Sequence, residues 1–143
     1  MAGILANQFR ETKLLGNTAA GTDQAAAASD VIDARGFDRA LVTLYLGAVT
    51  ATGKLVMSIQ ECDTSAGTFA DIPGADLGAE GTVLTGKSDN EIVFDVPVRE
   101  GYIKVAYQRT TANVELDALT VKLYNPKKLP VADSATLFKE VIV

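Results

Sequence analysis

The chain has 143 residues, 48% of them hydrophobic and 22% charged, which is the composition of an ordinary globular protein of about one domain. Its net charge of −5 and the scattering of its 13 Lys and Arg residues argue against a nucleic-acid ligand. Histidine is absent, which removes the commonest general base and every imidazole zinc ligand. Most hydrolase chemistries are therefore excluded.

The N-terminal sequence MAGILANQFRE lacks the basic region and the long apolar run of a secretory signal. No apolar stretch approaches the ~20 residues that a membrane-spanning helix needs. We therefore expect a protein made in the cytoplasm, with no membrane partner. The single cysteine, Cys62, cannot form an intramolecular disulfide, so the fold must be stabilised by packing.

Residues 1–29 are polar and alanine-rich, and AAAAS at 25–29 is too short to form a helix by itself. We interpret 1–29 as an N-terminal arm. Within it, FRETKLLG at 9–16 leaves two alternatives open, because it can complete the protein's own sheet or add to a neighbouring chain.

Residues 30–124 show period-two alternation, the spacing that places successive side chains on opposite faces of a strand. RALVTLYLGAV at 39–49 is apolar on both faces, which predicts a strand near the centre of a sheet. The turn TATG at 50–53 then makes KLVMSIQEC at 54–62 its hairpin partner.

Further along, EIVFDVPV at 91–98 contains Pro97, which marks an edge strand or a strand end. The alternation in NVELDALTVKLY changes phase near Ala118, which predicts a β-bulge. With shorter strands at SDVID, TFADI and GTVLT, the count is about eight. The predicted fold is an all-β, antiparallel, jelly-roll-like β-sandwich with extended N- and C-terminal arms; a partly open barrel is the alternative.

Residues 125–143 begin with NPKKLP and end with the apolar sequence LFKEVIV, which we interpret as a C-terminal arm. This segment either completes its own sheet or adds to the edge or groove of a neighbouring chain. The partner-binding residues predicted on the two arms are Phe9, Leu14, Leu15, Leu137, Phe138, Val141 and Ile142.

The acidic stretch SIQECDTSAGTFADIPGAD at 58–76 is the best candidate for chemistry. If Asp63 opened an EF-hand loop, Thr68 would stand where glycine belongs and Gly74 where the bidentate glutamate belongs. Solvated turn carboxylates are therefore favoured over a loose calcium site. That site would use Asp63, Asp71 and Asp76.

Glycosidase chemistry needs two carboxylates in a cleft lined by aromatic side chains, and this chain has no Trp, 4 Tyr and 5 Phe. We predict no catalytic, cofactor-binding or metal site. The chain is expected not to be an enzyme.

Three short motifs, in order along residues 30–124, resemble a family of small head proteins of tailed bacteriophages. The first is Val-Ile-Asp followed by Gly-Phe, the second is Ile-Gln-Glu-Cys-Asp with a later Thr-Phe-Ala-Asp, and the third is Tyr-Ile-Lys-Val. The matching residues of the second and third motifs are Ile59, Gln60, Glu61, Asp63, Thr68, Phe69, Asp71, Tyr102, Ile103, Lys104 and Val105. Neither arm is covered by the resemblance.

The resemblance implies a capsid cement or decoration protein, located on the outer surface of the virion capsid, that bridges neighbouring capsid subunits. Its implied partners are the major capsid protein and the protein itself as a homo-oligomer, with a dimer preferred. Similar phage proteins often continue with a basic Pro-Arg-His segment, whereas here Asn125-Pro126-Lys127-Lys128 precedes an apolar tail, so the mode of attachment is not carried over.

The alternative function is a carbohydrate-binding or host-recognition β module of a phage tail or fibre. Such a module needs an aromatic platform. The chain has no Trp, and Tyr102 and Tyr107 fall in a predicted strand rather than in loops. The capsid protein is therefore the favoured reading.

Overall fold

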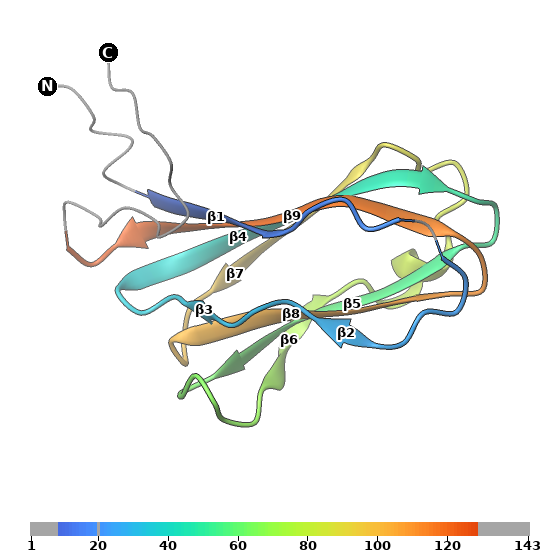
Figure 1. The fold of residues 1–143 in the computed structure, drawn as a ribbon. Helices are drawn as coiled ribbons and strands as arrows, with labels where there is room; N and C mark the ends of the chain where they lie inside the picture. Colours follow the sequence, from blue (N-terminus) through green and yellow to red (C-terminus); the bar gives the residue numbers. More distant parts are fainter. Residues whose placement is uncertain (1–8, 20, 129–143) are drawn as a thin grey trace, which may run out of the picture.

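The computed structural model describes residues 9–19 and 21–128. They form two antiparallel sheets that face each other (Figure 1). The predicted all-β antiparallel sandwich is confirmed. Sheet A has the strand order β1 (Phe9–Leu15), β9 (Val114–Pro126), β4 (Phe37–Val49) and β7 (Glu91–Pro97).

Sheet B is built around β8 (Tyr102–Thr110) and β5 (Lys54–Cys62). The short strands β2 (Ala27–Ala28) and β3 (Ile32–Asp33) both pair with one side of β8, and β6 (Ala70–Asp76) pairs with β5. A short 3-10 helix, η2 (Gly78–Thr82), follows β6.

The core lies between the sheets and is built from alternate residues of the long strands. In β4 these are Val42, Leu44 and Leu46, and β5, β8 and β9 contribute in the same way. Each fully buried aliphatic side chain contributes roughly 1.5–3 kcal/mol through its removal from water. The alternate residues of β4 that begin at Arg39 lie on the opposite side of the strand, where Tyr45 is exposed and Thr43 is only 8% exposed.

The hairpin predicted between 39–49 and 54–62 is wrong, because β4 belongs to sheet A and β5 to sheet B. The TATG turn carries the chain from one sheet to the facing sheet, with the Thr50 amide donating to the carbonyl of Asn113. Alternation shows which side chains face the core, but it does not identify the neighbouring strand. The true neighbours of β4 are β9 and β7, which come much later in the chain.

Three other details of the sequence interpretation are confirmed. Strand β4 lies inside sheet A, and Pro97 is the last residue of β7, the edge strand. The β-bulge falls where the phase of alternation changes, since Tyr45 pairs with Ala118 while the next residue, Leu46, pairs with Leu116.

The strand predicted at GTVLT is wrong, because Gly81 and Thr82 belong to η2 and the following residues form no strand. Gly81 packs directly against β5, and a Cβ at this position would lie 1.9 Å from the carbonyl oxygen of Leu55. A run of two or three apolar residues is too short to separate a strand from a turn of helix by its pattern.

The N-terminal segment also differs from the predicted arm. Phe9–Leu15 pairs with β9 from Phe9 opposite Tyr124 to Leu15 opposite Leu119, so this segment completes the protein's own sheet. Strand β9 continues to Pro126, and the Lys127 amide then donates to the carbonyl of Gly36. The sandwich therefore includes strands on both sides of the predicted range 30–124.

Candidate functional site

The solvent-facing side of sheet B holds four of the residues that carry the phage-protein resemblance, Gln60, Phe69, Asp71 and Lys104, whereas Ile59, Ile103 and Val105 are buried in the core. Gln60 of β5 pairs with Lys104 of β8 on one side and with Asp71 of β6 on the other. Gln60 Nε2 donates to Asp71 Oδ1 at 2.8 Å, and the Lys104 ammonium lies 4.6 Å from the centroid of the Phe69 ring. These four side chains form one group across three strands, which we call the motif cluster.

In the motif cluster, the Asp71 carboxylate accepts hydrogen bonds from side chains of the protein. Asp71 Oδ1 also accepts a hydrogen bond from Ser58 Oγ at 3.0 Å. Within residues 9–19 and 21–128, no group of three or more His, Cys, Asp or Glu residues is placed to hold a metal ion. The stretch 58–76 is thus the β5–β6 hairpin, in which Asp71 stabilises the packing of two strands.

The turn of this hairpin encloses the cysteine. Cys62 is buried, and its Sγ lies 3.7 Å from Asp63 Oδ1. A Cβ at Gly67 would lie 2.4 Å from that sulfur, so glycine lets the turn close over it. Beside it, Glu61 Oε2 is buried and has no hydrogen-bond partner in the described part of the chain.

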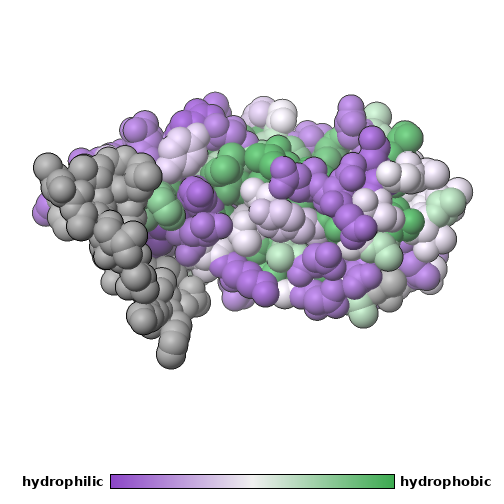
Figure 2. All heavy atoms as spheres, turned by 90° about the horizontal axis from the view of Figure 1, so that it is seen from above, coloured by the Kyte–Doolittle hydropathy of each residue, from purple (hydrophilic) through white to green (hydrophobic). Residues whose placement is uncertain are grey.

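The solvent-facing side of sheet A carries a different set of residues, which we call the sheet A face. It consists of Arg39, Leu41, Thr43 and Tyr45 of β4 and the residues paired with them in β9 and β7, extended by the pairs of β9 in β1. Directly opposite residues in antiparallel strands share a face, so the register defines this surface. Figure 2, seen from above, shows hydrophobic residues between hydrophilic ones on this side.

Two of the largest exposed apolar side chains lie on the sheet A face. Tyr45 is 42% exposed and Val93 is 49% exposed. Thr43 pairs with Val93, and Tyr45 pairs with Glu91, one step along the strands. The two apolar side chains are therefore diagonal neighbours, close enough to form one patch.

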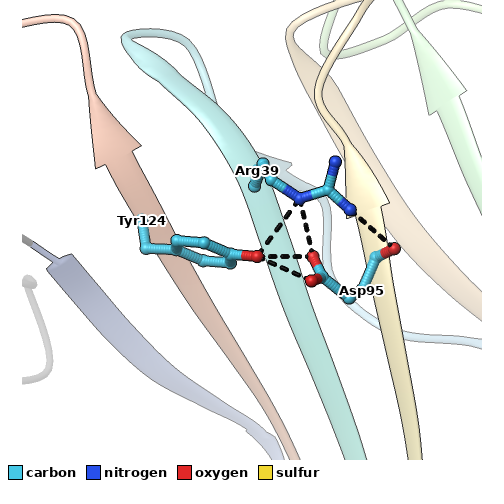
Figure 3. A network of polar contacts seen from close by, with 3 residues as sticks. All are labelled: Arg39, Asp95 and Tyr124. Atoms are coloured by element: carbon cyan, nitrogen blue, oxygen red, sulfur yellow. Dashed lines mark hydrogen bonds and ion pairs between the residues drawn. The ribbon is translucent and has the colours of Figure 1, made fainter.

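A polar network borders this patch and joins three strands (Figure 3). The Tyr124 hydroxyl lies 2.7 Å from both carboxylate oxygens of Asp95. Arg39 Nε donates to Asp95 Oδ1 at 2.9 Å and to the Tyr124 oxygen at 3.1 Å. Since these residues come from β4, β7 and β9, the network fixes the orientation of a tyrosine and an arginine on a flat surface.

The network changes the acid–base behaviour of its members. Partial burial raises the pKa of Asp95, but the hydrogen bonds from Tyr124 and Arg39 outweigh it, so the pKa lies below its ordinary value. The hydrogen bond to Asp95 raises the pKa of Tyr124. Asp95 therefore stays ionised and Tyr124 stays protonated throughout the neutral range.

The predicted partner-binding residues have separate locations. Leu14 and Leu15 are partly buried and pack against the core. Phe9 is half-buried, and the Lys122 ammonium lies 4.7 Å from the centroid of its ring. The other predicted residues, Leu137, Phe138, Val141 and Ile142, lie outside the described residues.

A cavity of about 200 Å³ lies where η2 covers one end of the sandwich. Its lining is mainly aliphatic, from Leu46, Leu84 and Ile92, with Lys87 and Glu91 also contributing. This volume is below the roughly 300 Å³ at which small-molecule pockets begin.

Sequence reasoning missed the Tyr45–Val93 patch and the Arg39–Asp95–Tyr124 network. The usable signal was the odd-numbered set Arg39, Leu41, Thr43 and Tyr45, which is more polar than the even-numbered set that forms the core.

In the part of the chain that the structure describes, no helix is long and apolar enough to span a membrane. A scan of the chain against protein-family models found no match, and a search of curated proteins also found none.

Proposed function

We propose that the protein is a capsid cement or decoration protein, which binds the outer surface of a tailed-phage head and bridges neighbouring capsid subunits. The observation that carries the proposal is the motif cluster. Gln60, Phe69, Asp71 and Lys104 belong to the motifs that resemble phage head proteins. Gln60 contacts Asp71, Lys104 contacts Phe69, and Gln60 and Lys104 are directly paired in neighbouring strands. These four matching residues thus lie close together in the fold.

The architecture supports the same role. Cementing needs a rigid module with surfaces that bury area across a seam, and it needs no catalysis. Binding to the assembled shell alone would stabilise the shell by mass action. The strand orders β1-β9-β4-β7 and β8-β5-β6, with consecutive strands mostly alternating between the sheets, support the finer description of a jelly roll.

The major capsid protein is the proposed partner, and the outer surface of the virion is the proposed location. Because Leu14 and Leu15 pack against the protein's own core, Phe9 is the residue of the N-terminal segment that would contact the capsid protein. In the C-terminal segment, the apolar residues of LFKEVIV would make this contact.

The carbohydrate-binding alternative is less well supported. The Tyr102 ring is covered by the Arg35 guanidinium, 4.9 Å from the ring centroid, and Arg35 is held by Asp33 at 2.7 Å. Tyr107 packs against the core. Neither tyrosine offers the open ring face on which a sugar stacks.

The proposal is tested with phage heads that lack the protein, mixed with the purified full-length chain and sedimented. We expect saturable co-sedimentation, and heads that withstand higher temperature when the chain is bound. A chain that lacks residues 134–143 should bind more weakly, while its own thermal unfolding curve remains that of a folded domain. Equal occupancy by both chains would remove the C-terminal segment from the mechanism.

A further inference from the structure

Strand β7 forms one edge of sheet A and, within the described residues, it pairs only with β4. Just beyond its end, the Val98 amide donates to the carbonyl of Asp38, the residue opposite it. Even-numbered residues of β7 therefore direct their amides and carbonyls to β4, and odd-numbered residues direct theirs away from the sheet. Val93 and Asp95 thus offer backbone groups to a further strand.

Among the long strands at the sheet edges, β7 is the most apolar. It contains the consecutive residues Ile92, Val93 and Phe94. By contrast, β6 is interrupted by Pro73 and Gly74, and the sequence FRETKLL of β1 has charged residues at its centre. Natural proteins usually cover or interrupt their sheet edges, because an open edge pairs with other chains. Strand β7 is therefore the edge that most needs a covering strand.

The cavity at η2 lies on the inner side of this edge. Ile92 lines it from β7, and Leu77, Val83 and Leu84 line it from the segment around η2. Val83 is 65% exposed, so the apolar lining reaches the surface. Directly opposite residues of an antiparallel pair share a face. A residue placed opposite Ile92 by a further strand would therefore point to the side of the cavity.

The described part of the chain ends within reach of this edge. Strand β9 ends at Pro126 and β7 at Pro97, and both pair there with the first residues of β4. The position beyond β7 is three strand spacings from β9, about 14 Å. Residues 129–136 can span about 26 Å when extended. The apolar segment 137–143, LFKEVIV, can therefore start beside Pro97 and run antiparallel to β7.

We infer that residues 137–143 of the same chain add to the free edge of β7 as an antiparallel strand, with Ile142 opposite Ile92. The Ile142 side chain then points to the cavity and its aliphatic lining. On the outer face, Val141 lies opposite Val93, which is 49% exposed without this strand, and covers part of its surface. The added strand also occupies the outward backbone groups of β7.

The charges of the segment favour this register. Lys139 lies opposite Asp95, and opposite charges paired across strands are stabilising. A shift by one residue either brings Glu140 opposite Asp95 or places Lys139 on the inner side opposite Phe94. In the inferred register Glu140 lies opposite Phe94, which is only partly buried, so the carboxylate reaches water at the edge. The Asp95 carbonyl accepts from Arg39 Nη2 at 3.1 Å, and its second lone pair serves the added strand.

The added strand refines the capsid contact proposed above, and this refinement alone rests on the proposed function. Leu137 and Val141 lie on the outer face, beside the Tyr45–Val93 patch. Phe138 and Ile142 lie on the inner face. Leu137 and Val141 are therefore the residues of the segment left for the capsid protein.

Amide hydrogen exchange of the full-length chain, followed by NMR, tests the strand pairing without a capsid. The Val93 amide should exchange at least about tenfold more slowly in the wild type than in Ile142→Asn, because this variant places an amide in the apolar cavity. The Ile92 and Phe94 amides point to β4, so they should exchange slowly in both chains and show that the fold is intact. A Val93 amide that exchanges at the same rate in both chains would overturn the inference.

The neighbouring variant Val141→Asn tests the register. Because Val141 lies on the outer face, this variant should lower the protection of the Val93 amide by less than Ile142→Asn does. The opposite order would contradict the register. The wild-type protection should be the same at low and high protein concentration, since the segment and the edge belong to one chain. Protection that rises with concentration would show pairing between copies and would also overturn the inference.

Discussion

Gly81 shows how one residue can fix the connection between two elements. The β carbon of alanine would lie 1.9 Å from the Leu55 carbonyl oxygen, which is backbone and cannot rotate away. We predict that Gly81→Ala lowers the free energy of unfolding by at least about 2 kcal/mol, measured by urea denaturation. Gly16→Ala is the control, because the nearest atoms there are 3.7 Å away at the end of the Lys13 side chain. Similar losses in both variants would contradict this account of η2.

Arg109 is a second position where one side chain holds separate segments together. It is buried, and its Nη1 donates to the carbonyls of Ala19 and Val114, at 2.6 and 2.8 Å. Arg109→Met would leave these carbonyls without their donor, and we expect a loss of about 2–4 kcal/mol in the free energy of unfolding. The exposed Lys87→Met should change it by less than about 0.5 kcal/mol. Equal unfolding midpoints for the two variants would show that the buried guanidinium contributes nothing.

Among the elements, the Arg39–Asp95–Tyr124 network makes the pairing of β4, β7 and β9 depend on pH. The pKa of Asp95 is lower in the folded protein than in the unfolded chain. Its contribution to stability is therefore present above the unfolded pKa, near 4, and is lost as the pH falls through the folded pKa. The effect is small, because the Asp95 side chain is 45% exposed and solvent screens it.

The variant Asp95→Asn should therefore lose less stability between pH 5 and pH 2 than the wild type does, roughly the range in which carboxylates protonate. Thermal melting across this range measures the difference. Asp38→Asn is a suitable control, since its nearest cation, Lys127 Nζ, is 3.9 Å away and both side chains are more than half exposed. Identical pH profiles for Asp95→Asn and the wild type would show that the network does not stabilise the fold.

The strands themselves could be predicted from sequence more readily than their neighbours. The apolar residues on both faces of 39–49, the position of Pro97 and the change of phase at Ala118 are local signals, and each has its expected structural counterpart. Strand order in this sandwich depends on residues far apart in the chain, such as Leu44 opposite Leu119. No local pattern encodes such a pair, which is why the hairpin from β4 to β5 was predicted wrongly.

The same limit applied to the candidate site. Residues 39–49 have apolar residues on both faces, so the slightly more polar odd-numbered set that carries Tyr45 was too weak a signal to be used in the prediction. The network of Arg39, Asp95 and Tyr124 joins three strands that are separated by more than 80 residues from first to last. By contrast, Gln60 and Asp71 belong to one hairpin, and their shared motif was visible in the sequence.

At the scale of the whole molecule, the two outer sides of the sandwich differ. The outer side of sheet B carries the motif cluster, while the sheet A face carries the Tyr45–Val93 patch and the Arg39–Asp95–Tyr124 network.

The most direct test of the proposed function is co-sedimentation of the full-length chain with purified tailed-phage heads that lack it. We predict saturable binding in a fixed ratio to the major capsid protein, and heads that survive a higher temperature once occupied. A chain that stays in the supernatant at every concentration, with no change in the thermal stability of the heads, would contradict the proposed function.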